Sequence, residues 1–343
     1  MLGTGYALPG EPVTTEQLLA CIERNFGVDV RATGTAVARK LGVASRHLCR
    51  DLLQRHERPR LGENNAALAA RAVEQALQDA GVGVADLSYL IGHTCSPGQA
   101  LPPNIAAVAD LLGYGGPYFE LRQACTGFAN ALIAARGLLA APHCGPVAIV
   151  GSETGSVYFD PVRAAEDHGQ LVNLLQMGDA AGACVIGRDV HGGAGTLSHV
   201  YFGQQGAARR PGFSLECGGS DVASNERTRL EFFHHYADVR ASGPELFELG
   251  LAAARSMGVD SGQLDGVIPH QVSGRIAGQL APYLGFSTDQ LFVNADRCGN
   301  TGSAAIWLAL AQLRPQLRTG NRVLVLGAEA SKYMYGGFLY VHG

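Results

Sequence analysis

The 343-residue sequence predicts an α/β fold made of two copies of one strand-and-helix unit. Short apolar segments typical of buried strands alternate with helical segments of ten or more residues, and the order of segments repeats in the second half. Hydrophobic residues make up 47% of the chain and charged residues 16%, which indicates a large buried core. Because strands that alternate with helices form mainly parallel sheets covered on both faces, two stacked halves would give five layers: helix, sheet, helix, sheet, helix.

The repeat consists of four matches in the same order: a strand, the helix after it, a three-residue junction and a second strand. The matched positions include His93 with His270, Cys125 with Asn300, and Val147 with Val323. We therefore divide the chain into an N-terminal half, residues 1–186, which carries Cys125, and a C-terminal half, residues 187–343, which carries His270 and Asn300. A twofold relation between the halves would bring Cys125 and Asn300, each at a helix N-terminus, to the centre of the molecule beside His270.

Apolar periodicity and glycine or proline stops define the elements of the first half. Residues 32–60 are rich in arginine and histidine and are left unassigned. The expected elements are a strand before Pro9-Gly10, helices at about 15–25, 61–80 and 105–112, strands at 87–92 and 147–150, an irregular loop at 94–104, and an apolar helix after Cys125.

A glycine-bounded turn at 176–182 leads into a small-residue strand that closes the first half. Residues 187–240 are polar and glycine-rich, and we expect them to cross between the halves. The expected elements beyond them are a helix at 243–256, a strand at 265–269, helices after His270 and Asn300, and strands from Val323 and over 335–341.

Composition excludes several functional classes. The net charge is −4 and the pI is near 6.3, and no basic run or basic patch with interleaved aromatic residues is present, so we expect no nucleic-acid partner. No apolar run reaches membrane-spanning length, and the start lacks the layout of a signal peptide. The eight cysteines form no CxxC pair, which is typical of reduced thiols in the cytoplasm. The histidines show no metal-ligand spacing, so we expect no metal.

Cys125 lies in a tight small-residue junction, Ala124-Cys125-Thr126-Gly127, between an extended segment and the apolar helix. Unpaired N–H groups and the helix dipole at a helix N-terminus stabilise a thiolate, which predicts a lowered thiol pKa and a usable nucleophile. The alternative is a buried cysteine that acts as a small hydrophobic side chain. Likewise, His270 alone could be a core histidine bonded to the backbone, and Asn300 a helix N-cap.

Together, Cys125, Pro269-His270-Gln271 and Gly299-Asn300-Thr301 form the Cys–His–Asn pattern of the thiolase-fold condensing enzymes. The chain resembles β-ketoacyl-ACP synthase III over nearly its whole length, which implies a thiolase-like five-layer αβαβα fold from two duplicated halves. The supporting motifs are the opening Gly3–Pro9, the segment Leu41–His47, similar to TGI-x-x-R, and Gly178–Ala183, similar to GDGAGA.

The resemblance implies that Cys125 takes an acyl group from acyl-CoA or acyl-ACP, and that malonyl-ACP then loses CO₂ to give a carbanion that attacks the acyl-enzyme. It assigns His270 and Asn300 to the enolate oxygen, which needs donors that do not themselves react. It assigns the thioester oxygen to the Cys125 N–H and a second N–H near Ser331. It implies no cofactor, because acyl-CoA and malonyl-ACP are substrates.

The resemblance also implies partners. Leu101-Pro102-Pro103 corresponds to the family segment that crosses a dimer interface into the neighbour's acyl tunnel, so we expect a homodimer with Leu101 in the pocket. Arg275 is a candidate contact for the acidic face of the acyl carrier protein, or it is a solvated arginine.

Departures from the family pattern point to a specialised fatty-acid or polyketide-type pathway with a starter other than acetyl-CoA. The clamp of Trp and Arg for the CoA adenine is not recognisable between Phe26 and Arg46, Gly327–Lys332 replaces the glycine-rich C-terminal loop, and HQAN-x-R becomes His270–Arg275 with its asparagine lost. The loop at 94–104 has no acidic residue, which argues against relatives that use a glutamate base there.

Two alternatives stay open. One is acyl transfer to an oxygen or nitrogen nucleophile with His270 as general base. The other is a non-catalytic subunit that shapes a partner's pocket, against which the intact Cys–His–Asn set argues.

Overall fold

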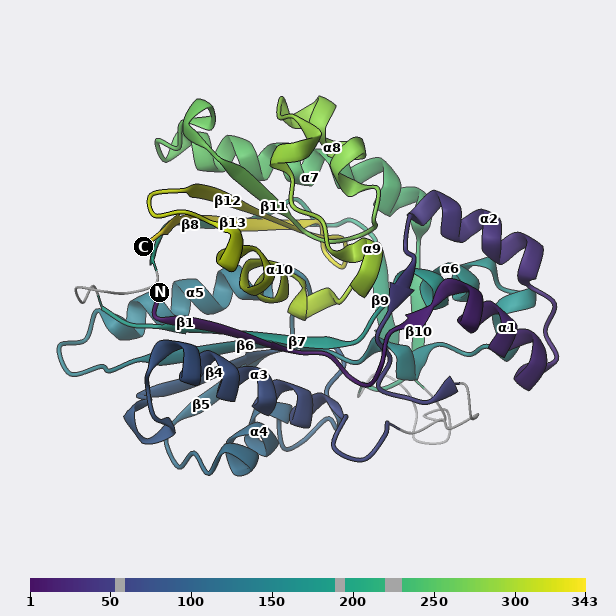
Figure 1. Cartoon of the computed structure of the whole chain (residues 1–343), viewed down its shortest axis with the longest axis horizontal. Helices are drawn as coiled ribbons and strands as arrows, with labels where there is room; N and C mark the ends of the chain where they lie inside the picture. Colours follow the sequence, from purple (N-terminus) through teal and green to yellow (C-terminus); the bar gives the residue numbers. More distant parts are fainter. Residues whose placement is uncertain (53–58, 189–194, 220–229) are drawn as a thin grey trace.

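The computed structural model describes residues 1–52, 59–188, 195–219 and 230–343. Its elements stack in five layers (Figure 1): two helices on one outer face, a sheet, a helical middle layer, a second sheet, and two helices on the other outer face. The thiolase-like α/β architecture expected from the repeat is therefore confirmed. The N- and C-termini lie near each other at one end of the stack.

The first sheet has the strand order β1-β7-β6-β4-β5. Its strands are β1 (Gly3–Ala7), β4 (Tyr89–His93), β5 (Tyr118–Leu121), β6 (Val147–Glu153) and β7 (Ala180–Ile186). Strands β4, β5 and β6 pair in parallel, whereas β7 runs antiparallel to both β1 and β6.

The second sheet has the order β11-β12-β13-β8. Its strands are β8 (Gly195–Gln204), β11 (Gly266–Pro269), β12 (Arg322–Glu329) and β13 (Met334–His342). Only β11 and β12 pair in parallel; β13 is antiparallel to both β12 and β8. A single parallel bridge between Val267 and Leu291 occupies the position that β5 has in the first sheet, so the two sheets repeat one pairing pattern.

Helices α5 (Gly127–Leu139) and α10 (Ala305–Leu313) form the middle layer. Their side chains meet in the core between the sheets, where Phe128 packs edge-on against Trp307 at 6.0 Å between ring centres and Trp307 stacks on Phe338 at 5.8 Å. These three buried aromatic side chains join α5, α10 and β13 in one core. The outer helices are α3 (Asn65–Ala80) and α4 (Asn104–Leu112) on one face, and α7 (Tyr236–Ser256) and α8 (Ile276–Leu284) on the other.

A lateral region joins the stack on one side (Figure 1). It contains α1 (Thr15–Phe26), α2 (Arg31–Leu41), α6 (His168–Gln176) and the small sheets β2 (Val13–Thr14) with β3 (Ser45–Arg46) and β9 (Phe213–Glu216) with β10 (Glu231–His234). The short helix α9 (Ala295–Cys298) leads into the middle layer. The 3₁₀ helices within the described residues include Val84–Asp86, Gly155–Tyr158, Val162–Ala165, Ser261–Gln263, Thr288–Gln290, Gly302–Ala304 and Arg314–Gln316.

One expectation about the sheets was wrong. The sheets are mixed rather than mainly parallel, because β7 is antiparallel to β6 and β13 is antiparallel to β12. A short turn joins β12 to β13, and the longer connection from β6 to β7, which contains α6, begins and ends at the same end of the sheet. The crossing at 187–240 also contains the regular strand β8, whose polar and half-buried residues hide its alternation. The first-half strands end at Ile186 and the next described strand begins at Gly195; a domain boundary between 186 and 187 stays a prediction.

Candidate active site

Cys125 lies in the turn between β5 and α5, just before the helix begins at Gly127. The turn is closed by a hydrogen bond of 3.0 Å from the Gly127 N–H to the Ala124 carbonyl oxygen. A β-carbon on Gly127 would lie 2.6 Å from Nδ1 of His93, so only glycine lets the turn rest on that buried ring. The predicted junction before an apolar helix is present, and the nucleophile candidate is 8% exposed.

His270 directly follows β11, and its backbone N–H donates to the Leu326 carbonyl oxygen on β12 at 2.8 Å. Its ring is buried, and Nδ1 has no hydrogen-bond partner among the described residues. Burial lowers the pKa of His270 to about 4, so the ring is neutral at neutral pH. A neutral imidazole can donate from one nitrogen and accept at the other.

Asn300 follows α9 and is held by the segment before β7. Its backbone N–H donates to the Gln176 carbonyl oxygen at 2.8 Å, and its carbonyl oxygen accepts from the Gly178 N–H at 3.0 Å. Its side-chain Oδ1 accepts from the Gly302 N–H at 3.0 Å. This bond to the residue two positions on occupies the amide oxygen of Asn300 and leaves its amide nitrogen as a donor, while the N-cap of the following 3₁₀ helix is Thr301.

One cavity of about 610 Å³ is lined by Cys125, His270 and Asn300 together. The repeat thus brings one residue of the first half and two of the second to a shared space between the halves. Aromatic and aliphatic side chains form much of the remaining wall, among them Phe213, Tyr236, Leu246 and Phe247.

A second cavity of about 660 Å³ adjoins the first, since Phe213 and Glu329 line both. Its wall is mostly apolar, and its polar side chains include Asn65, Gln99, Gln123, Thr154, Tyr158 and Ser331. Ser331, predicted beside the thioester oxygen, lines this second cavity, whereas its neighbour Ala330 lines the cavity that holds Cys125.

Sequence reasoning missed two buried carboxylates beside the site, Glu153 and Glu329, which are 1% and 3% exposed. The repeat had paired the strands that end at these residues, and this pairing was the signal that could have found them. Glu329 accepts hydrogen bonds from the residue after Cys125, Thr126, at its N–H (2.9 Å) and its Oγ1 (2.8 Å).

The predicted lowering of the Cys125 pKa was wrong. Burial first, and then the negative charges of Glu329 and Glu153, raise the pKa of the thiol well above its usual range. Besides burial, the helix N-terminus contributes less than predicted, because the Thr126 N–H beside Cys125 donates to the Glu329 carboxylate. The resting site therefore holds a neutral thiol.

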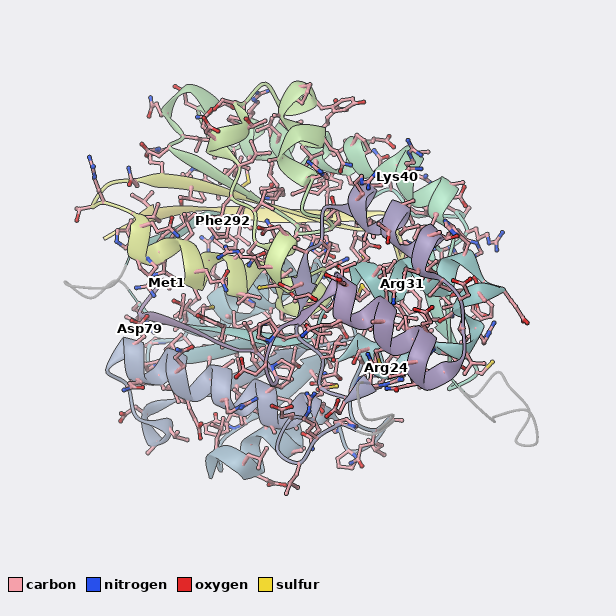
Figure 2. The ribbon with its side chains drawn as sticks, turned by 45° about the vertical axis from the view of Figure 1, so that its right-hand side comes forward. Met1, Arg24, Arg31, Lys40, Asp79 and Phe292 are labelled. Atoms are coloured by element: carbon pink, nitrogen blue, oxygen red, sulfur yellow. The ribbon has the colours of Figure 1, made fainter. Side chains whose placement is uncertain are left out.

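The two remaining predicted residues lie away from the cavity of Cys125. Leu101 is 83% exposed in the single chain. Arg275 is exposed at the start of α8 and lines a surface groove together with Arg31 and Arg39 of α2. Figure 2 shows Arg31 and Lys40 at opposite ends of α2, and Lys40 lines the cavity of Cys125.

Among the described residues, no group of three or more His, Cys, Asp or Glu side chains could hold a metal ion. The same part of the chain has no helix that is both long and apolar enough to cross a membrane. All eight cysteines are free thiols.

The fold and the shared Cys–His–Asn cavity define a condensing enzyme of the thiolase-fold class, and comparison with known proteins identifies the family. The sequence model of the 3-oxoacyl-[acyl-carrier-protein] synthase III family matches residues 119–206, and the sequence model of that family's C-terminal part matches residues 254–339. Beta-ketoacyl-[acyl-carrier-protein] synthase III of Nitratidesulfovibrio vulgaris (strain DP4) is 30% identical over 315 residues, with 86% of this chain and 87% of the relative covered. The chain belongs to the 3-oxoacyl-ACP synthase III family and is an acyltransferase.

Two solved structures match the whole fold. AbyA1, described as a tetronic acid condensing enzyme, superposes with a TM-score of 0.87 at 27% sequence identity, covering 99% of this chain and 98% of that chain. The 3-oxoacyl-[acyl-carrier-protein] synthase III of Aquifex aeolicus VF5 superposes with a TM-score of 0.78 at 23% identity, covering 99% of both chains. The second likeness is evidence for the fold alone.

Proposed function

We propose that this protein loads an acyl group from an acyl-CoA or acyl-ACP thioester onto Cys125 and then condenses it with malonyl-ACP. The single observation that carries the proposal is the cavity shared by Cys125, His270 and Asn300. In the first half-reaction, Sγ of Cys125 forms a bond to the donor's carbonyl carbon. The donor's C–S bond breaks, and the leaving thiolate takes up the proton released by Cys125.

In the second half-reaction, malonyl-ACP loses CO₂, the resulting enolate carbon attacks the acyl carbon, and Cys125 leaves as a thiolate with 3-oxoacyl-ACP as product. Two donors suit the enolate oxygen: the amide nitrogen of Asn300, whose amide oxygen is held by Gly302, and a ring N–H of neutral His270. No described protein group accepts a hydrogen bond from the Cys125 N–H, and we assign that N–H to the thioester oxygen, with a second N–H from the loop at Ser331.

The acyl donor is proposed to differ from acetyl-CoA. The adjoining cavity of about 660 Å³ supports a larger acyl chain, because its wall is mostly apolar and carries several carboxamide and hydroxyl groups. Those polar groups favour a chain that can also hydrogen-bond to them, since buried polar groups left unpaired lower affinity. A specialised pathway is consistent with the similarity to a tetronic acid condensing enzyme.

Acyl transfer to an oxygen nucleophile is the second candidate. A tetronic acid ring contains a lactone C–O bond besides its C–C bonds, so the name of the similar AbyA1 makes oxygen acylation relevant here. In that reaction His270 would accept the hydroxyl proton as general base; its buried Nδ1 has no partner among the described residues.

The proposed partners are an acyl carrier protein and a second copy of this chain. Arg39 and Arg275 line one surface groove, and Lys40, next to Arg39 in the chain, lines the cavity of Cys125; these cations suit the acidic carrier expected for the family. A cytoplasmic homodimer, with Leu101 reaching the partner's acyl pocket, is proposed on the family resemblance.

The test is intact-protein mass after exposure to a panel of acyl-CoA and acyl-ACP donors, including hydroxylated acyl chains, with Cys125→Ala as control. The adduct is then chased with malonyl-ACP. We expect a mass gain in the wild type only, discharged as 3-oxoacyl-ACP with loss of CO₂. An adduct that malonyl-ACP cannot discharge, but a hydroxyl acceptor can, favours oxygen acylation. If no donor gives an adduct, both reactions are contradicted and the remaining hypothesis is a non-catalytic subunit.

A further inference from the structure

The two buried glutamates hold loops that belong to the opposite halves of the molecule. Glu329 ends β12 in the second half and bonds to Thr126, the residue after Cys125 in the first half. Glu153 ends β6 in the first half and bonds to Ser303, three residues after Asn300 in the second half. Each carboxylate therefore crosses between halves to the loop of a catalytic candidate.

The contact at Glu329 fixes the loop of Cys125. Its Oε2 accepts from both the N–H and the hydroxyl of Thr126, which is fully buried, and its Oε1 accepts from the hydroxyl of Ser331. Glu329 also lines both cavities. Hydrogen bonds to a carboxylate are stronger than those between neutral groups, so the direction in which Cys125 faces the cavity depends on this side chain.

The contact at Glu153 has the same form. Its Oε2 accepts from Ser303 at the N–H (3.3 Å) and at Oγ (2.8 Å). On the first-half side, it accepts from Cys95 Sγ at 3.2 Å and from the Ser96 hydroxyl. A β-carbon on Gly302 would lie 2.8 Å from the Glu153 side chain, so the Asn300 loop passes directly over this carboxylate.

We propose that Glu329 and Glu153 form a reciprocal clamp, in which the carboxylate of each half positions the catalytic loop of the other. Glu329 is a positioning residue for Cys125 and acts on acylation, whereas Glu153 is a positioning residue for Asn300 and acts on the step that uses its amide nitrogen. The assignment of each glutamate to one half-reaction rests on the proposed function, whereas the contacts between the glutamates and the loops are independent of it.

The clamp has an electrostatic consequence at Cys125. The carboxylate that positions the loop also holds a negative charge beside the thiol and uses the helix N-terminal donor that would stabilise a thiolate. Glu329 therefore favours the thiol over the thiolate while it aligns Sγ. Removing its charge and removing its hydrogen bonds have opposite effects on reactivity, which makes the two contributions separable.

The test compares Glu329→Gln, which keeps an acceptor for Thr126 but loses the charge, with Glu329→Ala, which loses both. The rate at which iodoacetamide alkylates Cys125, measured by intact-protein mass at a series of pH values, reports thiolate formation without any acyl donor. We expect both variants to alkylate about tenfold faster at pH 7.5, because loss of a nearby like charge lowers the thiol pKa. We expect the rate of acylation to stay within about threefold of the wild-type rate in Glu329→Gln and to fall about 100-fold below it in Glu329→Ala.

The matched control is Glu120→Gln. Glu120 is a buried carboxylate at another helix N-terminus, where it accepts from the Ile105 N–H of α4 at 2.8 Å, and the same change there should leave alkylation of Cys125 unaltered. At the second contact, Glu153→Ala should leave the rate of acylation within a few-fold of the wild-type rate and slow the malonyl-ACP step about 100-fold. Glu153→Gln should restore most of the lost rate of the malonyl-ACP step.

Unchanged alkylation in both Glu329 variants, or equal loss of both half-reactions in Glu329→Ala and Glu153→Ala, would overturn the clamp. If Glu329→Ala does not fold, Thr126→Val, which removes one of the two donors to Glu329, replaces it with an expected loss of about tenfold in acylation. If no acyl donor is found at all, the proposed function fails, while the alkylation result still decides whether Glu329 controls Cys125.

Discussion

Gly178 and Cys298 are in such close contact that a β-carbon on Gly178 would lie 1.9 Å from the carbonyl oxygen of Cys298. Gly178 opens the motif Gly178–Ala183, and its N–H donates to the carbonyl oxygen of Asn300. A motif recognised from the sequence alone thus has a physical task here: it lets the segment before β7 support the loop of a catalytic candidate from the other half.

Gly178→Ala should therefore damage the site without touching a catalytic side chain. The added methyl group meets backbone, which cannot yield as a flexible side chain can, so we expect a loss of about 1–3 kcal/mol in the free energy of unfolding and a slower malonyl-ACP step. Denaturant titration and single-turnover assays measure the two effects.

Gly278→Ala provides the control for that substitution. Gly278 lies in α8, and a β-carbon added to it would have no neighbouring atom within 4 Å, so alanine there should be neutral or stabilise by up to about 1 kcal/mol. Equal behaviour of the two alanine variants would contradict the role assigned to the contact at Gly178.

Asn300→Asp separates the two functions of the Asn300 side chain. Aspartate keeps an oxygen to accept from the Gly302 N–H but replaces the amide nitrogen with a second acceptor. We expect decarboxylation of malonyl-ACP to slow about 100- to 1000-fold, the range found when one donor to a developing oxyanion is lost. Acylation of Cys125 should slow much less, through the further negative charge that aspartate adds to its cavity. Decarboxylation at the wild-type rate would show that the Asn300 side chain only accepts from the Gly302 N–H.

The elements that sequence reasoning predicted well are those with strong apolar periodicity. Helix α4 begins one residue before the predicted start, and β11 lies within its predicted range. The amphipathic helix at 61–80 begins only at Asn65, because Asn64 caps it by accepting from the Ala67 N–H. Strand direction was missed because β7 and β13 are as apolar as parallel strands, so their direction depends on connections rather than on composition.

The convergence of Cys125, His270 and Asn300 on one cavity could be predicted because the repeat constrained the three positions jointly. The sequence could not predict the protonation of Cys125, since the helix N-terminus beside it is occupied by Glu329, which is 204 residues away in the chain. A helix dipole favours a thiolate only when no stronger acceptor takes its terminal N–H groups. Long-range partners of this kind are not visible in local sequence.

Stability should fall in acid because of buried histidines. Burial lowers the pKa of His93 and of His270 from 6.5 to about 4. The unfolded chain then binds more protons between these values, so stability is complete above pH 6.5 and is lost as the pH falls toward 4, by about 3 kcal/mol for each ring. Glu153 and Asp179, whose pKa burial raises, act in the opposite direction, since the folded state holds their protons more tightly.

His93→Gln isolates one of these contributions. The free energy of unfolding, measured from pH 7.5 to 5, should change less steeply in this variant than in the wild type, even if its stability at pH 7.5 is lower. An unchanged slope would mean that His93 does not titrate differently in the folded and unfolded states.

Leu101→Asp tests the proposed homodimer. Leu101 is 83% exposed in the single chain, and strand β5 lies at the open edge of the first sheet with Tyr118 40% exposed. An apolar side chain and an unpaired strand edge left in solvent are typical of an interface. A charge at Leu101 should convert the dimer to monomer, or weaken it at least tenfold, in analytical ultracentrifugation. Leu61→Asp, at a leucine that is also fully exposed, should leave the dimer intact; a monomeric wild type, or equal weakening by both changes, would contradict this interface.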